Sequence, residues 1–167
     1  MQIRAAISNA LESCRSGEGH KASSTIWVGL SGGVDSTVLL HALAGLVSNA
    51  DSVLSFDKRI KAIHVHHGLS ENADGWAVQA QKLCAQISEE YKLAIDCYVE
   101  KVHLNNSSNG LEQAARTARY QVFEKYCEPK DVLLQGHHLD DQVETFFMRA
   151  IRGSGLTGLS SIPKQRN

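Results

Sequence analysis

The sequence has few of the features that mark membrane, secreted or cluster-binding proteins. Only two of its 167 residues are proline, and no apolar run approaches the roughly 20 residues needed to cross a bilayer. A basic, apolar signal peptide is also missing from the N-terminus. The four cysteines (Cys14, Cys84, Cys97 and Cys127) are far apart and include no C-x-x-C pair. We therefore expect a soluble, cytoplasmic protein without membrane association, zinc ribbon or dithiol redox centre, whose thiols are buried or incidental.

A basic excess is missing as well. The chain has 17 Lys and Arg against 18 Asp and Glu, for a formal net charge of -1 at pH 7. General attraction to nucleic acid is therefore not predicted, and any contact with RNA must be local. Four cations and no acid occur from Arg149 onward, which a solvated helix end would explain almost as well.

What is present is a regular alternation of short β-branched runs and longer helical patterns. Strands are predicted at 25–30, 60–65, 93–99 and 132–135, and helices at 37–47, 72–91, 110–126 and 140–151. We expect Val38 in the first helix, and Trp76, Val78, Leu83 and Ile87 in the second, to be buried. Four βα units predict an α/β fold, a Rossmann-like parallel sheet with helices on both faces. We expect one domain over 1–167, with residues 1–24 forming an N-terminal helix and linker.

The segment Ser31 to Ser36, SGGVDS, lies between the first predicted strand and its helix. Exposed amides and the positive end of a helix dipole bind anions at such a junction. Gly32 and Gly33 are expected to adopt unusual backbone angles and approach phosphate closely, with the hydroxyls of Ser31 and Ser36 donating from an exposed loop. Asp35 would repel a polyphosphate unless Mg²⁺ lay between them, so it indicates Mg-ATP.

Other nucleotide and hydrolase classes compete for this segment. G-x-x-x-x-G-K-[ST] and G-x-G-x-x-G are both absent, which argues against P-loop NTPases and dinucleotide-binding dehydrogenases. Residues 29–33, GLSGG, match the G-x-S-x-G nucleophile elbow of α/β-hydrolases. Asp131 with His137 or His138 would then complete a triad around Ser31, but Asp35 would remain unexplained.

Four sequence blocks in order resemble the family of bacterial tRNA(Ile)-lysidine synthetases, within the PP-loop ATP pyrophosphatases. The blocks are SGGVDS at 31–36, IHVHHGLS at 63–70 with NAD at 72–74, ARTARYQVF at 115–123 and GHHLDDQVET at 136–145. RGSG at 152–155 and GLS at 158–160 fit as well. The resemblance runs from about Ile26 to Ile162 and implies a PP-loop fold of the adenine nucleotide alpha hydrolase type.

The resemblance also implies a reaction. ATP would adenylate the C2 oxygen of the wobble cytidine, position 34, of a tRNA(Ile) with a CAU anticodon. The side-chain amine of L-lysine would then displace AMP and give lysidine. Members of this family are longer, so we expect an isolated N-terminal catalytic domain without the C-terminal tRNA-binding domains. Related PP-loop enzymes, including tRNA thiolases, or a nucleotide sensor on the same fold, remain alternatives.

Basic and imidazole side chains of these blocks are expected to contact ATP or the reacting base. Arg116 and Arg119 are both candidates to stabilise phosphate or activated base, and the family pattern favours Arg116. Such a pair on one helix face can also simply cover the surface or pair with acids. At the carboxyl ends of parallel strands, His64 is expected near the adenine, and His137 or His138 near the base.

Acidic side chains are expected to bind the cationic lysine substrate. Asp141 and Glu144 are three apart at a predicted helix start, so their carboxylates share one face. Helix capping is the plain alternative, which leaves open whether Asp140 or Asp141 is catalytic. The His64–His67 and His137–Asp141 runs also suggest metal sites, which we consider weaker interpretations than an ATP crevice.

Overall fold

The structure, a computed structural model, describes residues 2–15, 25–49, 59–104 and 110–136. Its elements in chain order are α1 (Gln2–Arg15), β1 (Ile26–Gly29), α2 (Val34–Val47), β2 (Arg59–His66), α3 (Ala73–Tyr91), β3 (Ala94–Lys101), α4 (Leu111–Tyr126) and β4 (Val132–Gln135). Met1–Gln135 form one compact unit, and Gly136–Asn167 form a second. Only Gly136 of the second unit is among the described residues, so the predicted helix at 140–151 lies outside them.

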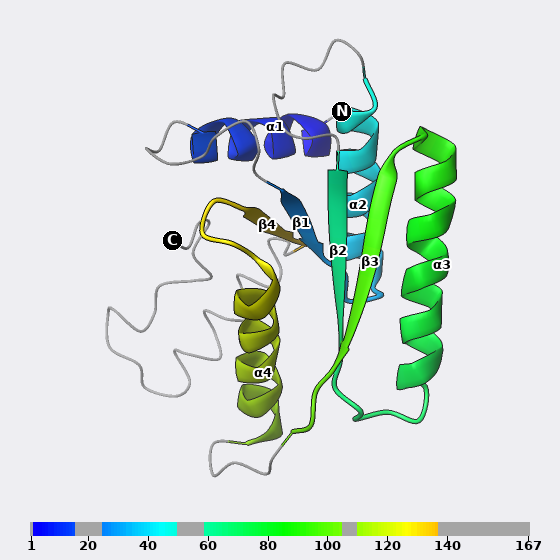
Figure 1. Ribbon diagram of the computed structural model, residues 1–167, viewed down its shortest axis with the longest axis vertical. Coiled ribbons are helices and arrows are strands. Elements are labelled where there is room, and N and C mark those ends of the chain that lie inside the picture. Colours follow the sequence, from blue (N-terminus) through cyan, green and yellow to red (C-terminus); the bar gives the residue numbers. More distant parts are fainter. Residues whose placement is uncertain (1, 16–24, 50–58, 105–109, 137–167) are drawn as a thin grey trace. The chain divides into compact units, whose positions relative to one another are not determined.

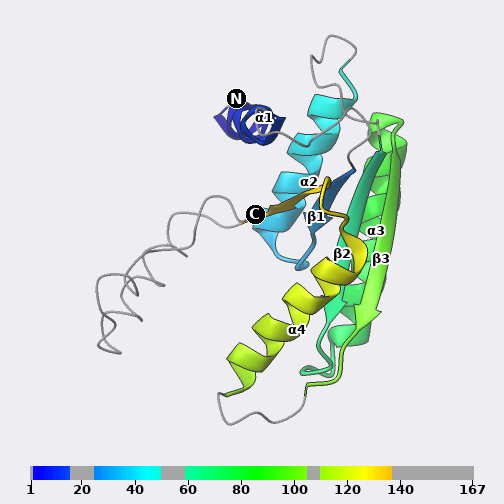
Figure 2. The same cartoon turned by 60° about the vertical axis from the view of Figure 1, so that its left-hand side comes forward.

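The four strands form one parallel sheet in the order β3-β2-β1-β4. From β1 to β2 to β3 the chain moves in one direction across the sheet, and it then returns to place β4 on the other side of β1. Because parallel crossovers are right-handed, this reversal puts α2 and α3 on one face and α4 on the opposite face. Figures 1 and 2 show this arrangement. The predicted α/β fold with helices on both faces is confirmed.

Two apolar clusters hold the layers together. One lies between the sheet and α1, α2 and α3, and includes Ile7 and Leu11 of α1. The other lies between the sheet and α4, where Trp27 and Ile63 meet Phe123. β1 contributes to both clusters because successive side chains of a strand point to opposite faces, and its first three residues are almost fully buried. This two-sided burial explains the continuous apolar run in β1.

The predicted buried side of α3 was partly wrong. Trp76 and Val78 are 48% and 49% exposed, and Val38 of α2 is also exposed. The inner face of α3 consists instead of mostly small residues at helical spacing, namely Ala73, Ala77, Ala80, Cys84 and Ile87. This stripe recurs every three or four residues, and its small side chains let the helix lie close to β2 and β3. The larger apolar residues lie outside the stripe.

Asp131 joins the starts of β1 and β4. Its carboxylate accepts hydrogen bonds from Thr25 N at 2.9 Å, Trp27 Nε1 at 3.0 Å and Glu128 N at 3.1 Å. These contacts lie at the amino ends of the strands, opposite the carboxyl ends. The structure therefore gives Asp131 a structural role and contradicts its use as a hydrolase acid. Among the described helices, none is long and apolar enough to cross a membrane.

Candidate functional site

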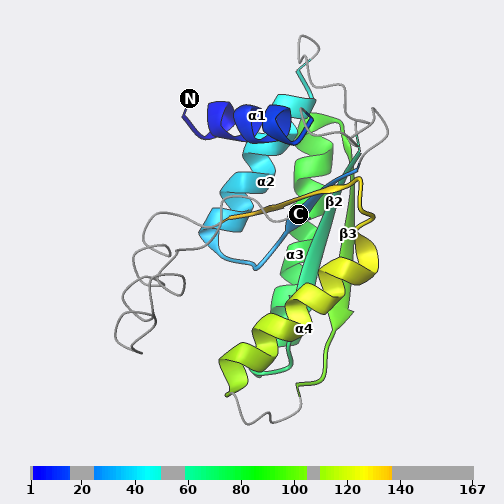
Figure 3. The same cartoon turned by 90° about the vertical axis from the view of Figure 1, so that its left-hand side faces the viewer.

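The predicted site residues that the structure describes gather at the carboxyl edge of the sheet. The SGGVDS segment follows β1, and His67 follows β2. The chain reverses direction between β1 and β4, and in open parallel sheets ligands bind outside the carboxyl ends at such a switch point. Figure 3 shows α4 running past this edge on the face opposite α2 and α3.

Gly29 brings the elements of the switch point together, a role the sequence did not reveal. A Cβ on Gly29 would lie 3.3 Å from Gln135 Cγ and 3.3 Å from Phe123 Cζ. Such a contact is tighter than most real Cβ contacts, so a side chain there would push against both β4 and α4. Gly29 thus serves close packing rather than a nucleophile elbow.

The loop after β1 is shorter than predicted, because α2 begins at Val34 rather than residue 37. Gly32 has φ +87°, a value that favours glycine. Gly33 has φ -81° and ψ 169°, which any residue can adopt, so the prediction of unusual angles is right for Gly32 and wrong for Gly33. Leu30 N donates to Ile63 O at 2.8 Å and ties the loop to β2.

Ser36 supports the loop from within rather than from an exposed position. It is 3% exposed, and its hydroxyl accepts from Ser31 N at 3.2 Å and donates to Gly33 O at 3.1 Å. Because the single Ser36 proton is used there, Ser31 Oγ is the donor in the 3.1 Å contact between the two hydroxyls. The structure therefore contradicts an exposed phosphate-donating Ser36 hydroxyl.

The first turn of α2 presents backbone amides and a carboxylate at this edge. Thr37 N donates to Gly33 O at 3.2 Å. The backbone N–H groups that precede Thr37 lie in the first turn, where no carbonyl of the same helix can accept from them. Val34 is 76% exposed. Its side chain is apolar, so only its backbone N–H can donate a hydrogen bond to an anion. Asp35 is exposed in the same turn.

His64 lies behind the loop. Its ring is 4% exposed, and Nδ1 lies 2.9 Å from Leu30 O. Because a carbonyl only accepts, Nδ1 carries the proton. This contact positions the start of the loop, and the place of His64 beside adenine stays a prediction.

His66 lies beside an ion pair between Asp74 and Lys101 at the neighbouring edge. Its Nε2 lies 3.2 Å from Asp74 Oδ1, and Lys101 Nζ lies 2.7 Å from the same oxygen. The hydrogen bond and charge of Lys101 hold the pKa of Asp74 below its usual value. These contacts join the carboxyl ends of β2 and β3 to the first turn of α3.

Arg119 and His67 carry buried nitrogen atoms that have no hydrogen-bond partner in the described part of the chain. The atoms are Arg119 Nε and His67 Nδ1. His66 Nε2 is also buried without a hydrogen bond, although it lies 3.2 Å from Asp74 Oδ1. Burial lowers the pKa of His67 and of Arg119, and the charge of Arg119 lowers that of His67 further. Buried polar groups without partners are costly, and an anion could accept hydrogen bonds from both.

Arg116 is placed differently. Its guanidinium carbon lies 5.4 Å from the centroid of the Tyr120 ring, a cation–π arrangement on α4 itself. Arg119 is on the inner face of the helix, one turn before Val122 and Phe123. The structure therefore favours Arg119 over Arg116 as the arginine of the site, against the preference taken from the family pattern.

The proposed base and lysine contacts, His137, His138, Asp140, Asp141 and Glu144, lie outside the described residues. The structure places none of them. Within the ranges it describes, no group of three or more His, Cys, Asp or Glu side chains could hold a metal ion.

Ser31 has neither the backbone nor the partners of a hydrolase nucleophile. A nucleophile elbow is a strained turn, whereas the non-glycine residue with positive φ in the described ranges is Lys92. The described partners of Ser31 Oγ are Ser36 Oγ and Gly33 N, not a histidine. The serine hydrolase alternative is therefore not supported.

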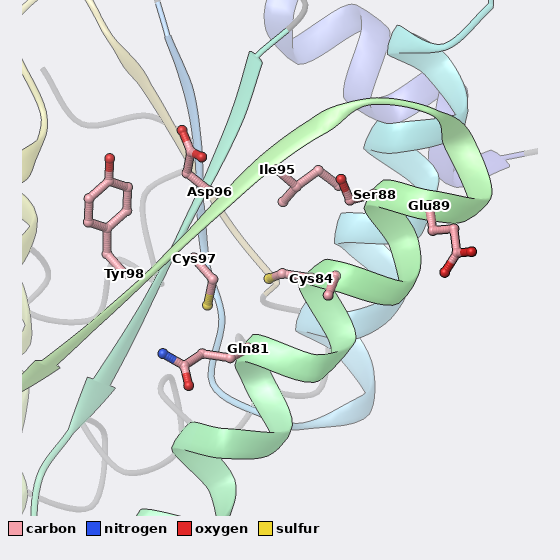
Figure 4. Close-up of a pocket in the computed structure, with 9 residues that line it drawn as sticks. Gln81, Cys84, Ser88, Glu89, Ile95, Asp96, Cys97 and Tyr98 are labelled. Carbon is pink, nitrogen blue, oxygen red and sulfur yellow. The ribbon is translucent and has the colours of Figure 1, made fainter.

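A cavity of about 790 Å³ lies elsewhere, between α3 and β3 (Figure 4). Its lining includes Cys84, Asp96 and Cys97 but no residue of the SGGVDS segment. The phosphate-binding features identified above are backbone and charged groups at an open edge. Cavity size therefore does not identify the nucleotide site in this fold.

The fold and loop define a PP-loop domain. The PP-loop domain family model matches residues 2–167, and the chain belongs to this family of ATP-using domains. It is 45% identical over 138 residues to the tRNA(Ile)-lysidine synthase of Haemophilus influenzae Rd, covering 83% of this chain and 30% of that protein. It is 47% identical over 137 residues to the Yersinia pseudotuberculosis tRNA(Ile)-lysidine synthase, covering 82% and 28%.

A solved structure shares the fold. The U34-tRNA thiolase NcsA from Methanococcus maripaludis, with its 4Fe–4S cluster, aligns with a TM-score of 0.53 and 21% identity, over 89% of this chain and 51% of that chain. At that identity the likeness concerns the fold alone. The chain spans about 30% of the length of the curated relatives it matches.

Proposed function

We propose that this chain is the ATP-binding catalytic domain of a tRNA(Ile)-lysidine synthetase. The enzyme ligates L-lysine to C2 of the wobble cytidine of tRNA(Ile) and releases AMP and pyrophosphate. The observation that carries the proposal is a SGGVDS loop at the switch point of a parallel sheet, in a chain 44–47% identical to tRNA(Ile)-lysidine synthases. We propose 1–167 as one PP-loop domain, with 1–24 as its N-terminal helix and linker, acting in the cytoplasm.

The loop would hold the pyrophosphate end of ATP. The cytidine C2 oxygen attacks the α-phosphorus, the bond to the bridging oxygen breaks, and pyrophosphate leaves. The cytidine is a weak nucleophile, so the site must fix the leaving group in line with the attacking oxygen. The Val34 amide supplies a donor that needs little rearrangement, since Ser36 and His64 already hold the loop. The Gly33 amide would exchange its 3.3 Å bond to Ser31 Oγ for one to phosphate.

Arg119 and His67 would bind a phosphoryl oxygen or the activated base. Their buried nitrogens lack partners among the described residues, and both groups present N–H donors when protonated. An anion between them would satisfy two unpaired polar groups at once. We assign the catalytic role to Arg119, and assign Arg116 to the outer wall of the site.

The donor set of the loop also fits Mg²⁺. Asp35 is an exposed carboxylate beside the amides proposed to bind phosphate, and Mg²⁺ prefers one or two carboxylates together with phosphate oxygens. When bound, Mg²⁺ would neutralise charge on the phosphates. Asp35 itself would hold the ion against the loop.

The second step requires a site for lysine. We propose that Asp141 and Glu144 bind its ammonium groups and that His137 and His138 lie near the reacting base. The lysine side-chain nitrogen loses a proton to solvent and attacks C2, the bond from C2 to the AMP oxygen breaks, and AMP leaves. Asp141→Asn and Glu144→Gln should weaken lysine binding by roughly ten- to a hundredfold, because each removes a charge-assisted hydrogen bond worth about 1.5 to 3 kcal/mol.

The deciding experiment combines ATP, Mg²⁺, labelled lysine and a tRNA(Ile) transcript with a CAU anticodon. It is run on this chain and on its full-length natural form. Lysine transfer to the transcript and lysine-dependent AMP release are the expected results, and ATP–pyrophosphate exchange separates the first step from the second. AMP formation that supports sulfur transfer but no lysine transfer would favour the thiolase alternative instead.

A further inference from the structure

Two cysteines that are distant in sequence face each other between α3 and β3 (Figure 4). Cys84 belongs to the inner stripe of α3 and is fully buried. Cys97 is half-buried on β3 and belongs to the same packed cluster. Side chains alternate along a strand, which directs Cys97 toward α3 while Tyr98 points to the α4 side.

The surroundings of the pair are open and polar. Both cysteines line the 790 Å³ cavity, together with Gln81, Ser88 and Asp96. β3 is the outermost strand of the sheet on this side. Cys97 is half-buried and lines the cavity, so a small reagent in the cavity can reach its sulfur, whereas Cys84 is fully buried.

The two thiols differ in character. The neighbouring Cys84 thiol lowers the pKa of Cys97, while Cys97 and burial raise the pKa of Cys84. Cys127 provides an internal comparison, because it is also half-buried but burial and Asp131 raise its pKa to about 12. A half-buried thiol of lowered pKa beside a second thiol is the arrangement found in oxidation-sensitive pairs.

We propose that Cys84 and Cys97 form a redox-modifiable dithiol that closes an intramolecular disulfide when a hydroperoxide oxidises Cys97. In the first step the Cys97 sulfur attacks a peroxide oxygen, the O–O bond breaks, and water or an alcohol leaves after taking up a proton. Sulfur is oxidised to a sulfenic acid and the peroxide is reduced. In the second step the Cys84 sulfur attacks the Cys97 sulfur, the S–O bond breaks, and the thiol proton leaves with hydroxide as water.

The sequence provides a direct readout. Trypsin cleaves after Lys82, Lys92 and Lys101, so the two cysteines fall on separate adjacent peptides, 83–92 and 93–101. The protein is exposed to limiting hydrogen peroxide under native conditions, its remaining thiols are blocked, and it is digested without reductant. We expect the covalently linked peptide pair, which dithiothreitol should separate. A parallel sample in urea should lose the preference for this pairing.

Alkylation of the reduced protein at pH 7 tests the assigned nucleophile. The pKa of Cys127 is raised to about 12, whereas that of Cys97 is lowered by its neighbour Cys84. A larger fraction of Cys97 is therefore in the reactive thiolate form at pH 7. Cys97 should react with iodoacetamide faster than Cys127, and equal rates would contradict the assigned nucleophile.

Variants separate the two steps. Cys97→Ala should leave Cys84 reduced, and Cys84→Ala should let Cys97 proceed to sulfinic acid without a link. The wild-type digest keeps the test independent of whether either variant folds. Native oxidation of wild type that takes Cys97 to sulfinic acid with Cys84 reduced would overturn the proposal. Linkage to Cys127 at equal yield would overturn it too.

Discussion

Replacing Ser36 by alanine should damage both the stability of the domain and its chemistry. The hydroxyl is 3% exposed and makes three contacts of 3.1 to 3.2 Å within the loop. Removing it leaves the Ser31 amide without that partner, although Ser31 is exposed and water can replace part of the loss. We expect a loss of about 1 to 2 kcal/mol in the free energy of unfolding. This corresponds to a decrease in melting temperature of roughly 2 to 8 °C for a chain of this size.

The rate of ATP–pyrophosphate exchange should fall by more than the loss of folded protein would explain. The same hydroxyl fixes Ser31 and Gly33 relative to the first turn of α2, and misplacement of a positioning group by about 1 Å can cost roughly a hundredfold in rate. The assay is ATP–pyrophosphate exchange with tRNA on the full-length protein, beside calorimetry of the same samples.

Two controls make this prediction specific. Asp35→Asn alters an exposed carboxylate, so it should abolish exchange while changing stability by less than about 1 kcal/mol. Ser48→Ala removes an exposed hydroxyl whose bond to Gly45 O is 3.4 Å long, at the other end of α2, and should change neither quantity. If Ser36→Ala lost exchange but kept the wild-type melting temperature, Ser36 would be a phosphate contact and its buried supporting role would be wrong.

The remaining predictions concern other residues at the carboxyl edge of the sheet. Gly32→Ala should destabilise the domain by about 1 to 3 kcal/mol because φ is +87° there, whereas Gly33→Ala should cost about 1 kcal/mol or less; thermal unfolding compares them. Gly29→Ala should lower stability, because its Cβ would lie 3.3 Å from the side chains of Gln135 and Phe123. A melting temperature equal to that of the wild type would show that these two side chains can move aside without cost. Since burial and Arg119 hold the folded pKa of His67 below 6.5, its contribution to stability should be complete above pH 6.5 and decrease as pH falls. NMR titration should give a His67 pKa below 6.5 that rises on adding pyrophosphate, and Arg119→Gln should raise it without pyrophosphate.

The sequence alone was enough to predict the fold class, and it placed the SGGVDS segment at a strand–helix junction. Strand β4 was predicted at its observed bounds, and the starts or ends of the other strands moved by only one or two residues. These features depend on local patterns, since alternating apolar runs and a Gly-rich strand–helix junction are determined by residues close together in the chain. The start of α2 was predicted three residues late, because the polar Asp35 and Ser36 suit either a loop or a first helical turn.

Side-chain environments needed the tertiary structure, because they depend on neighbours that are far away in sequence. Whether Trp76 is buried depends on how closely α3 lies against the sheet, and the alanine stripe determined that. Our preference for Arg119 over Arg116 depends on which arginine has a buried nitrogen and acts on His67.

Cys84 and Cys97 also show the difference between what local sequence and what tertiary packing determine. The sequence has no C-x-x-C pair and predicted buried or incidental thiols. Yet the turn between α3 and β3 brings Cys84 and Cys97 face to face across thirteen positions. Helical period and strand alternation fix which way each side chain points, but only the packing of α3 on the edge strand decides that the two thiols meet.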